Sequence, residues 1–151
     1  MSNKHPYVWQ CMFVVVCALY LCLMPAVAGA QNEATVRVTA ILASHESTYI
    51  DSELVSIADE VKTLFTYSSF KKIKTYTVLL GEGQRDRVTL PREQDLVISY
   101  TNLDEKGNIA LNVSLADMLD TDITLIDGGH ILVGGPEYDD GTLILLIEAE
   151  L

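Results

Sequence analysis

The residues to consider first for chemistry are two histidines that stand close to acidic side chains. His45 and Glu46 are adjacent in a polar segment, and such a pair could act as a general base and acid. Nothing beside them supplies the third member of a catalytic triad, so the alternative is a solvated loop. His130 could bind a metal with Asp127 and Asp139, but their spacing matches no zinc or calcium pattern, and a turn histidine is the alternative. We predict no catalytic, cofactor-binding or metal-binding residue.

Two further motifs have ordinary explanations. Glu137 to Gly141 resembles a piece of a calcium loop, which needs oxygen ligands over about twelve residues and a closing glutamate. The chain returns to apolar residues at Leu143, so this segment is predicted to be a hairpin turn. Asn112-Val113-Ser114 fits the glycosylation sequon, but it falls within a predicted strand. The first 30 residues look like a bacterial leader, so we interpret the sequon as a chance match.

Glycines are frequent in the last third of the chain. Two glycine pairs bracket the apolar run Ile131 to Val133, and single glycines stand in two acidic turns. Glycine is suited to positive φ and to close backbone approach, so these residues are predicted to form structural turns. The predicted turn glycines are Gly107, Gly128, Gly129, Gly134, Gly135 and Gly141.

Residues 1–30 have the order of a signal peptide. A polar head containing Lys4 precedes an apolar run from Cys11 to Met24, and small residues end at Ala30. The run is short for a bilayer span, which needs about 20 residues, although an uncleaved anchor is the alternative. We predict cleavage before Gln31, a periplasmic or secreted protein, and membrane contact only through the leader before cleavage.

The charge and the cysteines narrow the class of protein. The chain has 151 residues and a formal net charge of −11. Lys4 is the only charged residue of 1–30, so residues 31–151 contain 9 basic and 21 acidic residues and have a net charge of −12. This charge repels phosphate backbones, so no nucleic-acid partner is predicted. The three cysteines all fall in the leader, which excludes a disulfide framework and a thiolate site from 31–151.

The remaining pattern is one helix among many strands. Apolar residues recur at helical spacing from Leu54 to Phe65, after the possible N-caps Asp51 and Ser52. Strands are predicted over residues 35–44, 70–80, 85–90, 95–103, 109–115, 121–126, 131–133 and 142–150. We therefore predict one α+β domain over 31–151, with one helix packed on a mainly antiparallel sheet or half-open sandwich.

Three short segments carry a resemblance to a known family. They are the paired strands Arg87–Leu90 and Asp95–Ile98, the hairpin Asp104–Val113, and the glycine segment Ile126–Pro136. Over about residues 85–147 the chain resembles the C-terminal β-module of bacterial secretins, the outer-membrane channels of secretion and pilus systems. It lacks the length for the family's periplasmic domains and shows no amphipathic membrane-facing segment, so the resemblance implies a shared β-module rather than a pore.

Together these patterns predict a non-catalytic exported domain that makes protein–protein contacts in the bacterial envelope, with other envelope proteins or with itself. An exposed strand at the end of the sheet would be the contact surface. The alternative is a secreted ligand-binding domain or a carboxylate-based hydrolase, which would need two carboxylates that converge on a cleft.

Overall fold

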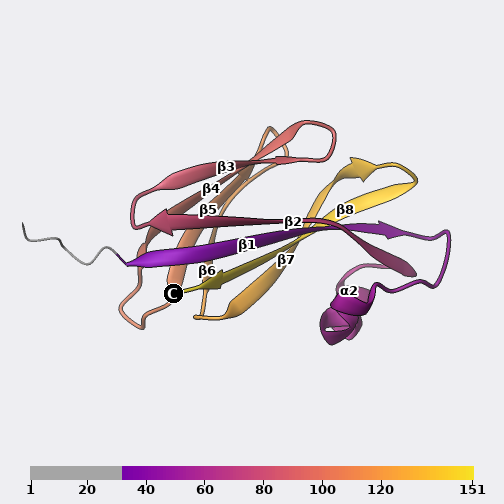
Figure 1. The fold of residues 1–151 in the computed structure, drawn as a ribbon, viewed down its shortest axis with the longest axis horizontal. Helices are drawn as coiled ribbons and strands as arrows, with labels where there is room; N and C mark the ends of the chain where they lie inside the picture. The colour runs from indigo at the N-terminus through magenta and orange to yellow at the C-terminus, as the bar shows by residue number, and fades with distance from the viewer. Residues whose placement is uncertain (1–31) are drawn as a thin grey trace, which may run out of the picture. The chain divides into compact units, whose positions relative to one another are not determined.

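The computed structural model describes residues 32–151; the predicted leader and its cleavage site lie outside the described residues. About 63% of this region is in strands and 11% is helical. The strands form two four-stranded antiparallel sheets (Figure 1). Within residues 32–151, no helix is both long enough and apolar enough to cross a membrane.

The first sheet, called sheet A, joins the two ends of the described region. Its order is β2-β1-β8-β7, so β1 and β8 are its central strands. Its strands are β1 (Glu33–Ser44), β2 (Ser69–Gly81), β7 (Gly129–Tyr138) and β8 (Gly141–Glu150).

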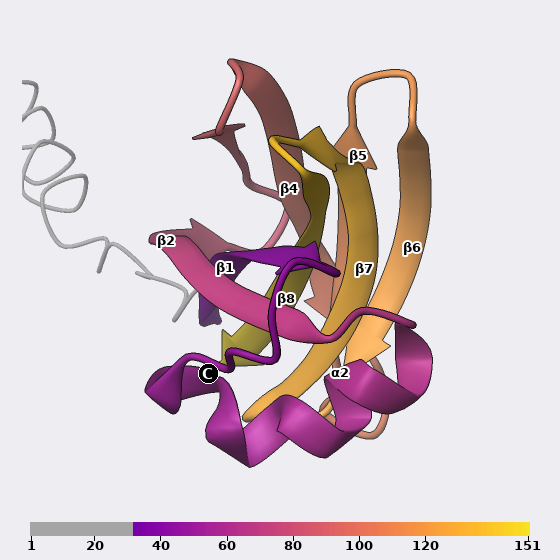
Figure 2. The ribbon, with the colours of Figure 1, turned by 90° about the vertical axis from the view of Figure 1, so that its right-hand side faces the viewer.

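The second sheet, sheet B, is a meander in which each strand pairs with the next along the chain. Its order is β3-β4-β5-β6, and Figure 2 shows β4, β5 and β6 running side by side. Its strands are β3 (Arg85–Leu90), β4 (Gln94–Leu103), β5 (Ile109–Leu115) and β6 (Leu119–Leu125).

The main core lies between the two sheets. Alternate residues of a strand point to opposite faces, and β5 shows this period clearly, because its odd-numbered residues are buried and its even-numbered residues are not. Sheet A contributes alternate residues of β1 and β8 to the same core. Prominent members of this core are Val36, Val38, Leu96, Ile98, Tyr100, Leu111, Val113, Leu145 and Ile147.

A smaller core lies on the outer face of sheet A, under two short helical segments, η1 (Ser52–Ile57) and α2 (Ala58–Leu64) (Figure 2). The carboxylate of Asp51 caps η1 by accepting a hydrogen bond from the Glu53 amide at 3.2 Å. Leu54 and Val61 are the buried residues of these segments, and they join a cluster that includes Phe70.

The prediction of an α+β fold was wrong: the domain is a β-sandwich. A short helical segment does cover part of a sheet, but the principal core is formed by the inner faces of two sheets. Alternation predicts which residues of a strand share a face, but it does not predict which sheet a strand joins. The prediction therefore left open a sheet or a half-open sandwich under the helix, whereas β3 to β6 form a complete second sheet.

An irregularity in β2 allows this strand to serve both cores. Its pairing with β1 shifts between Lys74, which faces Ala40, and Lys72, which faces Ile41. The extra residue reverses the facing of the strand. Tyr76 consequently packs against the main core, whereas Phe70 belongs to the outer core, although an uninterrupted alternation over residues 70–80 would put both on one face.

Candidate functional site

A sandwich of two open sheets leaves edge strands whose outward backbone groups could pair with another chain. Among residues 32–151 these edges are β2 and β7 in sheet A, and β3 and β6 in sheet B. Natural proteins block such edges with charges, prolines, bulges or covering elements. The four edges differ in how far they are blocked.

The two edges of sheet A carry several blocking features. On β2, Lys71, Lys72 and Lys74 surround the register shift that divides the strand. β7 contains Pro136 and a second register shift, and His130 at its start contacts Glu60 of α2 at 2.9 Å. Continuous pairing of a partner along either strand would have to accommodate these interruptions.

The β3 edge of sheet B is occupied by one of its own side chains. The Tyr100 amide donates a hydrogen bond to the Gln84 carbonyl, so the backbone groups of Gln84 face β4. Along an antiparallel strand, residues whose backbone groups face the partner strand alternate with residues whose groups face away. Arg87 is three residues from Gln84, so its amide points toward the open edge. Asp86 Oδ1 accepts a hydrogen bond from this amide at 2.7 Å. An incoming strand would therefore have to displace Asp86.

The same alternation shows which backbone N–H and C=O groups of β6 do not pair with β5. The backbone groups of Tyr100 point toward β3, so those of the next residue back, Ser99, point toward β5. Ser99 pairs with Asn112, so the even-numbered residues of β5 face β4 and the odd-numbered residues face β6. On β6, the residues that face β5 are odd-numbered. The backbone groups of Asp120, Asp122 and Thr124 consequently point out of the sheet.

Of the blocking features named above, β6 has the charged residues Asp120 and Asp122. Its register with β5 runs without interruption from Leu119 to Leu125, and its seven residues include neither proline nor lysine. Leu119 and Ile123 are partly buried against the main core. An added strand would extend sheet B and bring further side chains against this apolar margin.

Two carboxylates are held on the outer face of β6. The Asn112 side-chain nitrogen, on the neighbouring strand, donates to Asp120 Oδ1 at 3.0 Å and to Asp122 Oδ1 at 2.9 Å. Both aspartates are exposed and stand two residues apart, so they form a short anionic row along the open edge. Asn112 of the sequon thus has a structural contact of its own.

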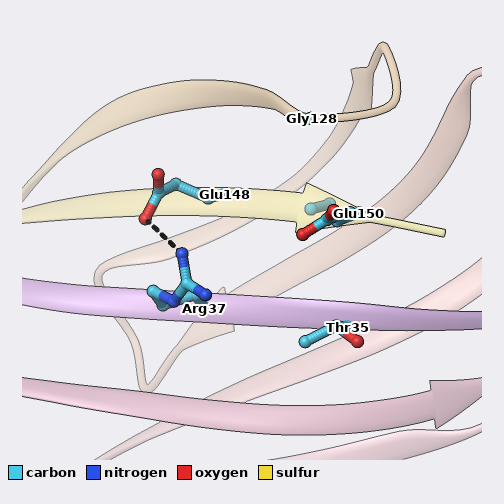
Figure 3. A pocket seen from close by; sticks show the side chains of 6 residues that line it. Thr35, Arg37, Gly128, Glu148 and Glu150 are labelled. Carbon is cyan, nitrogen blue, oxygen red and sulfur yellow. Dashed lines mark ion pairs between the residues drawn. The ribbon is translucent and has the colours of Figure 1, made fainter.

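A shallow hollow on the outer face of sheet A contains two further carboxylates (Figure 3). It is lined by Arg37, Glu148 and Glu150, and Arg37 Nη1 lies 3.7 Å from Glu148 Oε2. Its volume is about 70 Å³, whereas ligand pockets usually have about 300–1,000 Å³.

A larger groove of about 390 Å³ adjoins the hollow and shares Arg37 and Glu148 with it. Lys72 contacts Glu53 across the groove, so each of its two carboxylates has a cationic neighbour. A general base needs a carboxylate that is free to accept a proton, and this arrangement engages both. Glu53 and Glu148, the two carboxylates of the groove, are thus each ion-paired.

The structure separates the side chains of the first candidate pair. The His45 ring stacks on Tyr67, with 4.8 Å between the ring centroids, whereas Glu46 lines a groove with Lys71. The two side chains therefore contact different neighbours, and the two residues form the bend directly after β1.

The second candidate set is also dispersed. His130 contacts Glu60, Asp127 Oδ1 accepts a hydrogen bond from the Leu151 amide at 2.9 Å, and Asp139 lies 3.7 Å from Arg92. Residues 32–151 contain no group of three or more histidine, cysteine or acidic residues placed to hold a metal ion.

The predicted turn glycines fall into two groups. Gly107 and Gly128 have positive φ, +80° and +70°, in the turns before β5 and β7. The others are in strands: Gly129 and Gly141 begin β7 and β8, and Gly134 and Gly135 lie inside β7. At Gly135, an added Cβ would lie 3.0 Å from the Leu143 carbonyl oxygen, so close backbone approach explains that residue.

The acidic turn after β4 is held by Asp104. Its carboxylate accepts hydrogen bonds from the backbone and side-chain amides of Asn108 and from the Lys106 amide. These donors, with those of Asn108 contributing most, lower the pKa of Asp104 below its ordinary value. The carboxylate serves the turn itself.

Sequence reasoning overlooked a Ser-x-x-Lys spacing, which in some enzymes brings a nucleophilic serine to a lysine. Ser68 with Lys71, and Ser69 with Lys72, have this spacing. The Ser68 hydroxyl donates to the Ser47 carbonyl. Ser69 and Lys72 both lie in β2, where residues three apart point to opposite faces. Ser69 pairs instead with Ser47, and Lys72 with Glu53.

A buried hydroxyl in the main core provides a stability test. Tyr100 is fully buried, and its hydroxyl has no hydrogen-bond partner in the described part of the chain. Burial, with a smaller contribution from the charge of Glu82, raises the pKa of Tyr100. An unpaired buried polar group costs about 1–3 kcal/mol, so we expect Tyr100→Phe to raise the free energy of unfolding by about 1–2 kcal/mol in urea denaturation. A loss of stability would show that the hydroxyl is bonded.

Within residues 32–151 the fold is an antiparallel β-sandwich in which the edge strands β3 and β6 both pair without a register shift, and β3 has an outward amide capped by Asp86. Comparison of the chain with family models, with curated proteins and with solved structures finds no match. The secretin-like resemblance stays a prediction.

Proposed function

We propose that this protein is a non-catalytic exported domain that binds a segment of another protein of the bacterial envelope as an added strand along β6. The carrying observation is the open edge: the backbone groups of Asp120, Asp122 and Thr124 point out of sheet B, and the register of β6 is regular throughout. Main-chain hydrogen bonds supply the affinity in this mode of recognition, and alternate side chains supply the specificity. The proposed location rests on the signal-peptide pattern of residues 1–30.

Crosslinking in cells tests this proposal. A photo-crosslinking amino acid replaces Met118, which is 57% exposed and directly precedes β6, in the tagged full chain. We expect a discrete adduct, and we expect Thr124→Pro to reduce its yield about fivefold or more. Proline removes an outward amide without breaking the β5–β6 pairing, and one lost hydrogen bond costs about 1 kcal/mol.

Thr89→Pro is the matched control, because Thr89 is also an exposed threonine with an outward amide, on the opposite edge of sheet B. It should leave the adduct unchanged. Failure to obtain an adduct from position 118, or an adduct that survives Thr124→Pro in a folded variant, would contradict binding along β6.

A further inference from the structure

The chemistry of β6 also specifies the kind of segment that it would accept. We infer that the partner of β6 is a basic, extended segment in which lysine or arginine alternates with apolar residues. This inference rests on the proposed function, since it names the partner of the same edge. It follows from the two faces of β6 and from the charge of the domain.

The outer face of the added strand would lie beside carboxylates. Asp120 and Asp122 are exposed at alternate positions, and Asn112 holds both at 2.9–3.0 Å. Opposite charges on adjacent strands attract across a sheet, whereas like charges directly opposite repel. Two cations, two residues apart, would therefore face the two aspartates.

The inner face of the added strand would lie beside apolar side chains. Leu119 and Ile123 are partly buried and pack against the main core at its margin, with Thr121 between them. Residues of the partner that point inward would extend this core, so apolar residues fit there. The alternation of cations and apolar residues follows directly from the two-residue period of a strand.

The domain's own charge opposes a second copy as the partner. Pairing β6 with β6 would bring aspartates together, and residues 31–151 carry a net charge of −12. β3 of a second copy offers Arg85 and Arg87, but Asp86 occupies the Arg87 amide, and Arg87 already pairs with Asp95 at 2.9 Å. A basic segment from another protein meets neither obstacle.

Short peptides test the inference on the purified full chain. The probe is a capped six-residue peptide of alternating lysine and valine. Its controls are an alternating glutamate–valine peptide and a peptide with three lysines followed by three valines. We expect the probe to bind about tenfold tighter than either control, because only the probe places cations on one face and apolar residues on the other.

Two protein variants locate the binding. Asp120→Asn with Asp122→Asn should weaken the probe about 3–10-fold, the loss expected for two cross-strand ion pairs. Thr124→Pro should weaken it further, and Thr89→Pro should not. If Thr124→Pro unfolds the domain, Asp120→Lys with Asp122→Lys takes its place, and that variant should prefer the glutamate peptide.

The outcomes separate this inference from the proposed function. The basic-strand partner is overturned if the aspartate variants bind the probe as well as the wild type does. It is also overturned if the peptide of three lysines followed by three valines binds the wild type as tightly as the probe does. If the in-cell adduct is nevertheless lost in Thr124→Pro, strand addition along β6 still stands. Self-association by light scattering that Thr124→Pro abolishes would make a second copy the occupant and overturn the basic partner.

Discussion

Gly141→Val is expected to destabilise the domain by about 3 kcal/mol or more, lowering the melting temperature by about 10 °C. Gly141 begins β8 opposite Ser44 of β1, and a Cβ there would overlap the Ala43 carbonyl oxygen. It would also lie 3.0 Å from the Ala43 carbonyl carbon and 3.1 Å from Leu42 Cδ1. Since the obstacle is backbone of a central strand, it cannot move aside cheaply. Thermal unfolding followed by circular dichroism measures the effect.

Gly134→Ala is the matched control, because Gly134 lies in the adjacent strand and a Cβ there would meet only Phe65, at 3.8 Å. We expect its melting temperature to stay within about 2 °C of wild type, as for a substitution without a new clash. Equal melting temperatures for the two variants would contradict the close approach of β8 to β1.

Phe70→Ala should cost about 3–5 kcal/mol, the range for removing a buried aromatic side chain. Phe70 is 1% exposed and forms part of the outer core with Leu54, Val61 and Ile144. It is therefore expected to anchor η1 and α2 on sheet A. Urea denaturation should show the lower midpoint, and hydrogen exchange should show faster exchange of the α2 amides.

Val55→Ala provides the comparison, because Val55 lies in η1, one of the segments that Phe70 is expected to anchor, and is 64% exposed. We expect a change of less than about 0.5 kcal/mol, as is usual for surface positions. A loss below about 1 kcal/mol for Phe70→Ala would mean that the outer core adds little to the stability of the domain.

Local patterns located most of the strands. The predicted ranges 85–90 and 109–115 coincide with β3 and β5, because proline or a turn ends each run and the alternation is regular. The Asp51 cap and the start of the helical segment were also recognisable, since capping depends on neighbours in sequence. The longest error was in β7, predicted as 131–133 but extending from Gly129 to Tyr138, because its glycines and Pro136 resemble turn residues.

The assignment of strands to sheets required information that local patterns do not contain. β1 lies between β2 and β8, and its pairing with β8 joins segments about 100 residues apart. The shift within β2 that sends Phe70 to the outer core is likewise set by pairing with β1. These non-local pairings produce two complete sheets, a choice that alternation alone left open.

The candidate site was visible only in part for the same reason. The sequence predicted a strand over 121–126, which omits Leu119 and Asp120 of β6. Whether a strand lies at an open edge depends on the pairing of the other strands, which local patterns do not contain. The capping of Arg87 by Asp86 likewise concerns a backbone amide whose direction follows from pairing with β4. The two histidines were considered because of their residue type, but in the fold His130 contacts Glu60 and His45 contacts Tyr67.

The strand orders of the two sheets also differ in the loop lengths that their pairings must close during folding. Sheet B is built from successive hairpins, so its pairings close short loops and are entropically inexpensive. Sheet A requires its central pair, β1 and β8, to meet across nearly the whole domain. We therefore expect the β1–β8 pairing, which closes the longest loop, to form after the local hairpins of sheet B.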